Sequence, residues 1–213
     1  TNATAVSALA QAALRHRFTL VHYSTDYVFD GTGGSGPDGA YRESDPIAPL
    51  NVYGQSKAAG EFAAASAGKH FLLRTSWVVG EGHNFVSTMQ KLARNGISPR
   101  VVDDQVGRLT FATELARATV HLLDTDAAYG TYHLTNSGSS ASWADIAAWV
   151  FAHEGRDPSD VTPVSTADYT AGQKGPQAPR PASSLLDLDR ISATGFTPTD
   201  QADNLREHLA PDA

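Results

Sequence analysis

The segment FTLVHYSTD, residues 18–26, decides the fold. It begins with a short apolar run, residues 18–23, which has an arginine before it and polar residues after it. A run of this length and composition is typical of a buried strand in a parallel sheet. The run leads into Ser24, Thr25 and Asp26, and ligands in open parallel sheets bind beyond the carboxyl ends of the strands. The segment therefore predicts a parallel sheet with a functional cleft at this strand end.

A second segment, YGQSK at residues 53–57, places a tyrosine and a lysine four positions apart. On a helix these side chains share one face, with Cβ atoms about 5–6 Å apart. A nearby ammonium favours the charged form of a phenol, so the pair can give a proton to an oxygen and take it back. The spacing alone is a weak signal, because a surface helix with an exposed lysine shows the same pattern. The strand end at residues 24–26 strengthens the prediction that both elements face one cleft.

Helices and strands alternate along the rest of the chain, which predicts βαβ units and a parallel sheet. We expect helices over residues 3–15, 51–61, 84–95, 113–123, 142–153 and 201–209. We expect further strands over residues 71–79, 101–102 and 130–135. In the first helix, the 3.6-residue period places Val6, Leu9, Ala10 and Ala13 on one buried face.

Two segments are expected to be irregular. Residues 29–41 are rich in glycine and are expected to form a loop over the cleft, either as a lid or as a solvent-exposed insertion. Residues 155–184 are rich in Pro, Ser, Thr and Gly and are expected to be mostly without regular structure.

The composition limits the class of protein. The chain has 213 residues, 41% hydrophobic and 18% charged, which suits one globular domain or one domain plus a lobe. It has no cysteine and no histidine pair at metal-ligand spacing, so we expect no metal site. A net charge of −7 argues against nucleic-acid binding, and no apolar run approaches the ~20 residues of a membrane span. The Ala-rich start of the chain does not have the features of a signal peptide. We expect a cytoplasmic protein without a membrane partner.

Three blocks of the sequence resemble one family. They are VHYSTDYVFDG (residues 21–31), PLNVYGQSKAAGE (residues 49–61) and RTSWV (residues 74–78), and together they are similar to the dTDP-4-dehydrorhamnose reductases, which are extended short-chain dehydrogenase/reductases. The likeness covers about residues 1–190. It departs from the family at residues 109–110, which read Leu-Thr where the family often has Pro-Thr.

The resemblance implies an α/β fold, a partial Rossmann-like doubly wound parallel sheet with a small C-terminal substrate-binding lobe. Residues 1–136 would be the remaining part of the NAD(P)-binding Rossmann domain, with residues 101–111 contributing to the lobe. Residues 137–213 would form mainly the substrate-binding lobe. No Gly-rich turn that cradles a dinucleotide diphosphate stands at the end of a first strand, so the chain is expected to lack about 80 residues, the size of one Rossmann half.

The resemblance also implies residue roles in a reaction that uses NADPH or NADH. Tyr53 would be the general acid, and Lys57 would assist it and hydrogen-bond the nicotinamide ribose, so both would be cofactor-binding as well as catalytic. Thr25 would hydrogen-bond the reacting oxygen or the phenol and fix its orientation, and it would also contact the substrate. The sugar pocket would be lined by Thr25, Asp26, Tyr27 and Trp77, although Tyr27 and Trp77 also fit a reading as core residues. The basic candidates for contact with the substrate diphosphate are Lys91, Arg94, Arg108 and Arg180.

The implied reaction is reduction of the C4 ketone of dTDP-4-dehydro-L-rhamnose to dTDP-L-rhamnose. Nucleotide-sugar 4,6-dehydratases resemble this strand end too, but they carry a glutamate where this chain has Tyr27, so simple ketone reduction is favoured. Another nucleotide-sugar reductase or epimerase remains open. A third reading is a non-catalytic partner subunit of the same fold, such as the regulatory subunit of methionine adenosyltransferase. A homodimer, or fusion to a missing N-terminal segment, also remains open.

The missing Gly-rich turn predicts a binding result. The diphosphate of a dinucleotide normally rests on that turn and on the helix behind it. We therefore expect these 213 residues alone to bind NADPH weakly or not at all, and to be inactive by themselves. Isothermal titration calorimetry checks this, and micromolar NADPH binding by the chain alone would contradict it.

Overall fold

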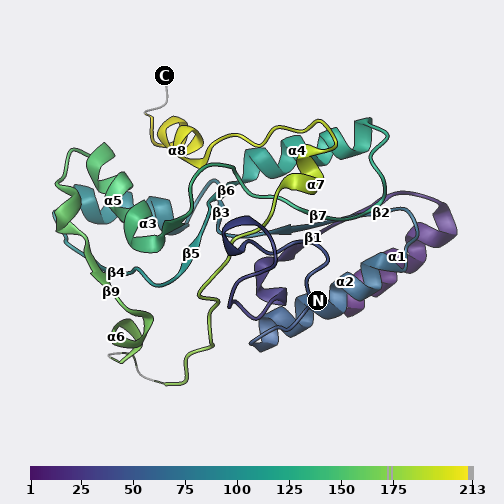
Figure 1. Ribbon diagram of the computed structural model, residues 1–213, viewed down its shortest axis with the longest axis horizontal. Helices are drawn as coiled ribbons and strands as arrows, with labels where there is room; N and C mark the ends of the chain where they lie inside the picture. The colour runs from purple at the N-terminus through teal and green to yellow at the C-terminus, as the bar shows by residue number, and fades with distance from the viewer. Residues whose placement is uncertain (172, 174, 211–213) are drawn as a thin grey trace.

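The structure, a computed structural model, describes residues 1–171, 173 and 175–210 (Figure 1). The α-helices are α1 (Thr4–His16), α2 (Val52–Ala65), α3 (Phe85–Arg94), α4 (Ala112–Asp124), α5 (Trp143–His153), α6 (Thr166–Thr170), α7 (Asp189–Ser192) and α8 (Gln201–Leu209). The strands are β1 (Leu20–Thr25), β2 (His70–Thr75), β3 (Val78–Val79), β4 (Arg100–Val102), β5 (Val106–Gly107), β6 (Thr110–Phe111), β7 (Gly130–His133), β8 (Ala141–Ser142) and β9 (Thr162–Val164). Short 3₁₀ helices are η1 (Asp26–Val28), η2 (Pro37–Gly39) and η3 (Pro158–Asp160).

The central sheet has the parallel order β1-β2-β7. Its register pairs Thr25 with Thr75 and Arg74 with His133. The carboxyl ends of β1 and β2 therefore lie side by side at one edge of the sheet. The predicted parallel strands at residues 18–23 and 130–135 are confirmed, within a residue or two at their ends.

Helices cover both faces of this sheet, which confirms the doubly wound α/β class. Helices α1 and α2 lie on one side, and α4 and α7 on the other (Figure 1). On the first side Val6, Ala10 and Ala13 of α1 pack against Ala64 and Leu72. The prediction that Leu9 belongs to this buried face is wrong, because Leu9 is 51% exposed. A helix this rich in alanine has apolar residues on more than one face, so periodicity alone does not select the buried one.

A second group of elements forms the lobe at the left of Figure 1, around α3, α5, β4 and β9. Strand β4 pairs in parallel with β9, and β5 pairs antiparallel with β8. The lobe core includes Met89 of α3, and Ile146 and Phe151 of α5. The prediction that residues 155–184 are mostly irregular holds for the described residues, and the short elements η3, β9 and α6 lie inside that range. Strand β9 is held by its partner β4, a contact distant in sequence that local composition does not reveal.

The predicted single strand at residues 71–79 is two strands. Strand β2 ends at Thr75, and β3 resumes at Val78 in a different sheet, paired with β6. Between them Trp77 adopts a left-handed conformation with φ +48°. This conformation is uncommon for a bulky residue and breaks the extended chain. The break turns the chain from the central sheet toward the lobe.

The Gly-rich loop at residues 29–41 is fastened to the segment 183–187. Ser183 N–H donates to the Gly31 carbonyl at 2.9 Å, and Tyr41 N–H donates to the Leu185 carbonyl at 2.8 Å. The Tyr41 ring stacks on Phe29 with centroids 4.2 Å apart. The loop is not among the residues that line the cleft at the end of β1. Among the described residues, no helix is long and apolar enough to cross a membrane.

Candidate active site

A cleft of about 960 Å³ opens at the carboxyl end of β1. The structure brings all six residues that sequence reasoning assigned to the site into its lining. They are Thr25, Asp26, Tyr27, Tyr53, Lys57 and Trp77. Thr25 ends β1, Asp26 and Tyr27 belong to η1, and Tyr53 and Lys57 lie in α2. The site is therefore built by the end of β1, the turn after it and the next helix, together with Trp77 from the segment after β2.

Helix α2 is positioned closely enough to aim Tyr53 at this strand end. Asn51 caps the helix by accepting a hydrogen bond from Gly54 N–H at 2.9 Å, as predicted. A Cβ at Gly54 would lie 2.1 Å from the Tyr27 carbonyl oxygen, so only glycine permits this approach. The close contact lets the Tyr53 ring meet the Tyr27 ring edge-to-face, with centroids 5.6 Å apart.

Lys57 is held beside Tyr53, one turn along the same helix. Its Nζ donates to the Tyr23 carbonyl oxygen of β1 at 2.6 Å. Burial lowers the pKa of Lys57, and the carboxylate of Glu61 opposes this effect. The anchored ammonium leaves N–H groups for further partners, because it carries three donors. Tyr53 itself is half exposed, so its hydroxyl is open to a ligand in the cleft.

The Thr25 hydroxyl belongs to a chain of hydrogen bonds. It accepts from Tyr27 N–H at 3.2 Å and donates to Asp26 Oδ1 at 3.0 Å. The second oxygen of Asp26 accepts from the Ser184 hydroxyl at 2.5 Å. Burial raises the pKa of Asp26 to about 6, although the hydrogen bonds from Ser184 and Thr25 oppose the change. Sequence reasoning found Asp26 but not its partner, which lies 158 residues away in the chain.

Trp77 forms a wall of the cleft. Its ring stacks on Trp143 of α5, with centroids 3.8 Å apart and planes 19° from parallel. Gly107 makes room for this wall, since a Cβ there would lie 2.9 Å from the Trp77 ring. Trp77 therefore lines the cleft and also packs against a neighbouring ring, so each of the two expected environments applies to part of its side chain. A left-handed non-glycine residue at a cleft is a common mark of a functional site.

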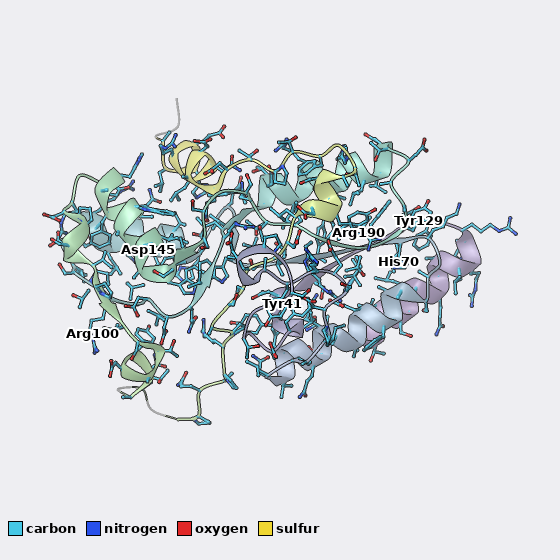
Figure 2. All side chains as sticks on the ribbon, in the orientation of Figure 1. Tyr41, His70, Arg100, Tyr129, Asp145 and Arg190 are labelled. Atoms are coloured by element: carbon cyan, nitrogen blue, oxygen red, sulfur yellow. The ribbon has the colours of Figure 1, made fainter. Side chains whose placement is uncertain are left out.

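A second cavity of about 410 Å³ lies on the other side of Trp143. Its lining combines apolar residues such as Phe85 and Met89 with the polar Arg100 and Gln105. Trp143 and Arg180 line both cavities, so the two are neighbours. Arg100 lies on β4 at the lobe end of the molecule (Figure 2). Sequence reasoning missed Arg100 and Gln105, because α3, β4 and α6 meet here only in the folded chain.

The structure separates the four basic candidates. Arg180 lines both cavities. Arg94 instead pairs with Glu154, with Nε and Oε2 2.7 Å apart. Arg108 donates to the Leu186 carbonyl at 3.1 Å, and neither Arg108 nor Lys91 lines either cavity. Arg180 is thus the member of the four that the fold places in reach of a ligand in these cavities.

A buried ion pair supports the strand end from below. Arg74 on β2 contacts Glu61 on α2 through Nη2 at 2.8 Å and Nε at 3.0 Å. The Ser24 hydroxyl of β1 donates to the same carboxylate at 2.5 Å. The three residues tie α2, β1 and β2 together directly beneath Thr25 and Lys57. No local sequence pattern predicts this pair.

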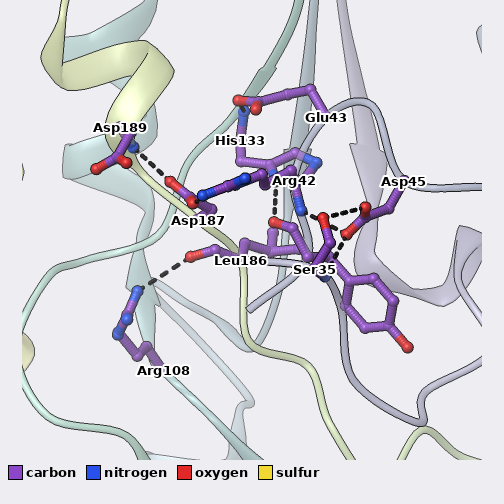
Figure 3. Close-up of polar contacts among 10 residues, drawn as sticks. Ser35, Arg42, Glu43, Asp45, Arg108, His133, Leu186, Asp187 and Asp189 are labelled. Atoms are coloured by element: carbon purple, nitrogen blue, oxygen red, sulfur yellow. Dashed lines mark hydrogen bonds and ion pairs between the residues drawn. The ribbon is translucent and has the colours of Figure 1, made fainter. Parts of the chain in front are cut away.

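His133 lies next to this ion pair at the end of β7, and its environment predicts a neutral ring. Nδ1 is within 3.0 Å of the Tyr41 carbonyl (Figure 3). Nε2 is within 3.4 Å of Arg74 Nη1. We assign the proton to Nδ1, because a carbonyl accepts and a guanidinium donates. Burial, together with the Arg74 charge, lowers the pKa of His133 to about 3.

We therefore expect His133 to stay neutral in the folded chain between pH 7 and pH 4. A folded-state pKa below the ordinary ~6.5 adds stability above pH ~6.5, which is lost as the pH falls toward the folded value. NMR of the His133 Cε1–H resonance checks this. The urea-unfolded chain is the control, since there the ring should titrate near pH ~6.5. Titration near that pH in the folded chain would contradict the prediction.

The residues present fit one end of a dinucleotide. Tyr53 and Lys57 face the cleft where a nicotinamide ribose would lie, beside Thr75 at the end of β2. The buried Thr75 hydroxyl has no hydrogen-bond partner among the described residues. The Gly-rich segment at residues 31–36 does not line the cleft, so it is not a turn for the diphosphate. The fit is therefore to the nicotinamide end, and no residue is assigned to the rest of the dinucleotide.

A doubly wound parallel sheet with threonine at one strand end and Tyr-x-x-x-Lys on the next helix defines the short-chain dehydrogenase/reductase class. Within this class, residues 1–213 match the family described as the RmlD substrate binding domain. The chain belongs to this family. Its sequence relatives include proteins named dTDP-4-dehydrorhamnose reductase. The expected family resemblance is thus confirmed.

The relatives agree in sequence and in fold. The dTDP-4-dehydrorhamnose reductase of Aggregatibacter actinomycetemcomitans is 40% identical over 212 residues, covering 93% of this chain and 69% of the relative. The reductase of Salmonella typhimurium is 40% identical over 202 residues, covering 89% of this chain and 64% of the relative. A crystal structure of the Bacillus anthracis reductase in complex with NADP has a TM-score of 0.84 at 35% identity, covering 97% of this chain and 69% of that one. The chain therefore spans about two thirds of the length of these relatives.

Proposed function

We propose that this chain supplies the substrate-binding and proton-donating part of a reductase that converts dTDP-4-dehydro-L-rhamnose to dTDP-L-rhamnose, with NADPH or NADH as hydride donor. The observation that carries the proposal is the convergence of Thr25, Tyr53 and Lys57 on one cleft at the end of β1. The names of the relatives, and the NADP in the Bacillus anthracis structure, support the substrate and the cofactor.

The chemistry of these residues suits ketone reduction. A dinucleotide whose nicotinamide end is held beside Tyr53 and Lys57 would supply the hydride for C4 of the sugar. Tyr53 gives its hydroxyl proton to the ketone oxygen, which becomes the C4 hydroxyl. Lys57, anchored on the Tyr23 carbonyl, stabilises the phenolate that remains on Tyr53 and contacts the nicotinamide ribose. Thr25 hydrogen-bonds the phenol or the reacting oxygen and fixes its orientation.

The two adjoining cavities suit a two-part substrate. We place the sugar in the cleft between Tyr27 and Trp77, and the nucleotide in the cavity lined by Arg100 and Gln105. Arg180 lines both cavities, so it can meet the diphosphate that joins the two parts of the substrate. A guanidinium is well suited to this, because its fork of N–H donors matches phosphate oxygens.

We assign the cofactor-binding and substrate-binding parts of the chain to different residue ranges. Residues 1–136 carry the Rossmann part, apart from α3 and residues 101–111, which join the lobe. Residues 137–213 form most of the substrate lobe, apart from α7, which packs on the central sheet (Figure 1). The pairing of β4 with β9 and of β5 with β8 supports this division. The proposed setting is the cytoplasm, where nucleotide sugars for cell-surface polysaccharide are made. A homodimer or a fused N-terminal segment would be compatible with this activity.

The test needs a dinucleotide-binding half. A chimera that joins the Gly-rich Rossmann half of a relative ahead of residue 1 is mixed with NADPH and dTDP-4-dehydrorhamnose generated in situ, and absorbance at 340 nm is followed. Substrate-dependent NADPH oxidation is the expected result. A folded chimera that binds NADPH but oxidises none would overturn the proposal, and would favour another sugar substrate or a non-catalytic partner role.

A further inference from the structure

The Thr25 hydroxyl has its single hydrogen committed inside the protein. Its oxygen accepts from Tyr27 N–H at 3.2 Å, while its hydrogen points to Asp26 Oδ1 at 3.0 Å. An ionised carboxylate can only accept, so while Asp26 is charged the Thr25 hydrogen stays on that side. Thr25 then faces the cleft with a lone pair. It can accept a hydrogen bond from a phenol, but it cannot donate one to a ketone oxygen.

Asp26 is placed to control this hydrogen. It is 4% exposed, and its two oxygens take one hydroxyl each, from Thr25 and from Ser184. No ion pair to Asp26 occurs among the residues that the structure describes. A carboxyl that is buried without a cation favours its protonated form. The shift in the pKa of Asp26 to about 6 has this cause.

We propose that Asp26 is a positioning residue whose protonation state decides whether the Thr25 hydroxyl offers a lone pair or a hydrogen to a ligand oxygen in the cleft. The inference rests on the proposed reductase function and adds to it a residue that acts through Thr25 rather than on the substrate. When Asp26 takes a proton from solvent, its own O–H donates to Thr25 Oγ1. The Thr25 hydrogen is then free to turn toward the cleft and donate to the developing alkoxide.

Other titratable groups face the same space and must be distinguished from Asp26. They are Tyr23 on β1, Tyr27 on η1, Tyr53 and Lys57 on α2, and Arg180 on the segment across the cleft. Burial raises the pKa of Tyr27 and lowers that of Lys57, so neither of these shifts has the Thr25 hydrogen bond as its cause. Among these groups, Asp26 is the one that accepts the Thr25 hydrogen.

The Ser184 contact extends this control to the segment that joins the lobe. Ser184 N–H donates to the Val106 carbonyl at 2.8 Å, and its hydroxyl donates to Asp26 at 2.5 Å. A ligand that shifts this segment would lengthen the second bond and favour protonation of Asp26. Through the Asp26 carboxyl, substrate binding in the lobe would therefore affect whether the Thr25 hydroxyl can donate a hydrogen bond into the cleft.

The first test uses the chain as it stands and needs no activity. The ¹³C resonance of the Asp26 carboxyl, identified by its loss in Asp26→Asn, is followed against pH. We expect an inflection near pH 6. Thr25→Val removes a hydrogen bond that is donated to the charged form of Asp26. The pH of the Asp26 inflection should therefore rise by about one unit. Thr25→Ser, which keeps the hydroxyl, should behave like the wild type. Thr32→Val is the matched control, because the Thr32 hydroxyl donates to Asp30 instead.

The inference is overturned if Thr25→Val leaves the pH of the Asp26 inflection unchanged or lowers it. The Thr25 hydrogen would then not be held by Asp26. Ser184→Ala should also raise the inflection, which provides a second check if Thr25→Val does not fold. These results do not depend on catalysis. They therefore decide the inference even if the proposed function fails.

The second test uses the chimera between pH 5 and pH 8.5. We expect kcat to fall by roughly tenfold as the pH rises through the inflection seen by NMR, because the oxyanion loses a donor. Asp26→Asn should lose this limb of the profile with little change in KM for NADPH. Asp187→Asn, which alters a carboxyl that is 6% exposed and bonded to Arg42, should keep it. An Asp26→Asn profile that retains the limb would overturn the inference while leaving the reductase function intact.

Discussion

Tyr53→Phe is expected to lower kcat of the chimera by about 10²–10⁴-fold, the usual contribution of a positioned general acid. The substitution removes the hydroxyl proton and leaves the ring that packs edge-to-face on Tyr27. The cleft should keep its shape, so KM for the sugar substrate should change little. Following NADPH oxidation at 340 nm under substrate saturation measures the effect.

Tyr129→Phe is the matched control for this experiment. Tyr129 is a similarly exposed tyrosine whose hydroxyl lies 3.5 Å from Thr19 Oγ1, and it does not line the cleft. It should retain the wild-type kcat. If Tyr53→Phe also keeps the wild-type kcat, another group donates the proton, and the role given to Tyr53 is wrong.

Arg74→Met is expected to lower the free energy of unfolding by about 3–5 kcal/mol. The change removes the guanidinium from Glu61 and leaves a buried carboxylate whose one remaining side-chain donor among the described residues is the Ser24 hydroxyl. The cost comes from the charge left without its partner rather than from the net contribution of the pair. Urea unfolding of the chain, followed by circular dichroism, measures the change.

Two further variants separate this mechanism from a general effect of losing an arginine. Arg206→Met breaks the exposed pair with Asp203 and should cost less than about 1 kcal/mol. Adding Glu61→Met to Arg74→Met removes the unpaired charge and should restore part of the lost stability. Equal losses in Arg74→Met and Arg206→Met would contradict this account of the buried ion pair.

Local pattern was sufficient for the parts of the fold that depend on neighbours in sequence. The apolar run at residues 18–23 predicted β1, and Asn51 and Ser142 predicted the starts of α2 and α5. The residues proposed for catalysis could be predicted because they lie within 33 residues of each other, on a strand end and the helix that follows. Family resemblance then gave them specific roles.

Features that need distant partners could not be predicted in this way. The Glu61–Arg74 pair joins a helix to a strand, and the Asp26–Ser184 bond spans most of the chain. The exposed side chain of Leu9 depends on which face of α1 meets the sheet, and the alanines hide that choice. The break after Thr75 depends on the backbone conformation of Trp77, which side-chain pattern does not encode.

The stacked pair of Trp77 and Trp143 gives the molecule a built-in optical reporter. The chain contains three tryptophans, and two of them lie with ring centroids 3.8 Å apart. Indole rings this close couple their excited states, so the pair should produce a near-ultraviolet circular dichroism signal that disappears when the rings separate. One ring follows β2 and the other begins α5. The absorption of polarised light thus reports directly on whether the sheet and the lobe remain in contact, without any added label.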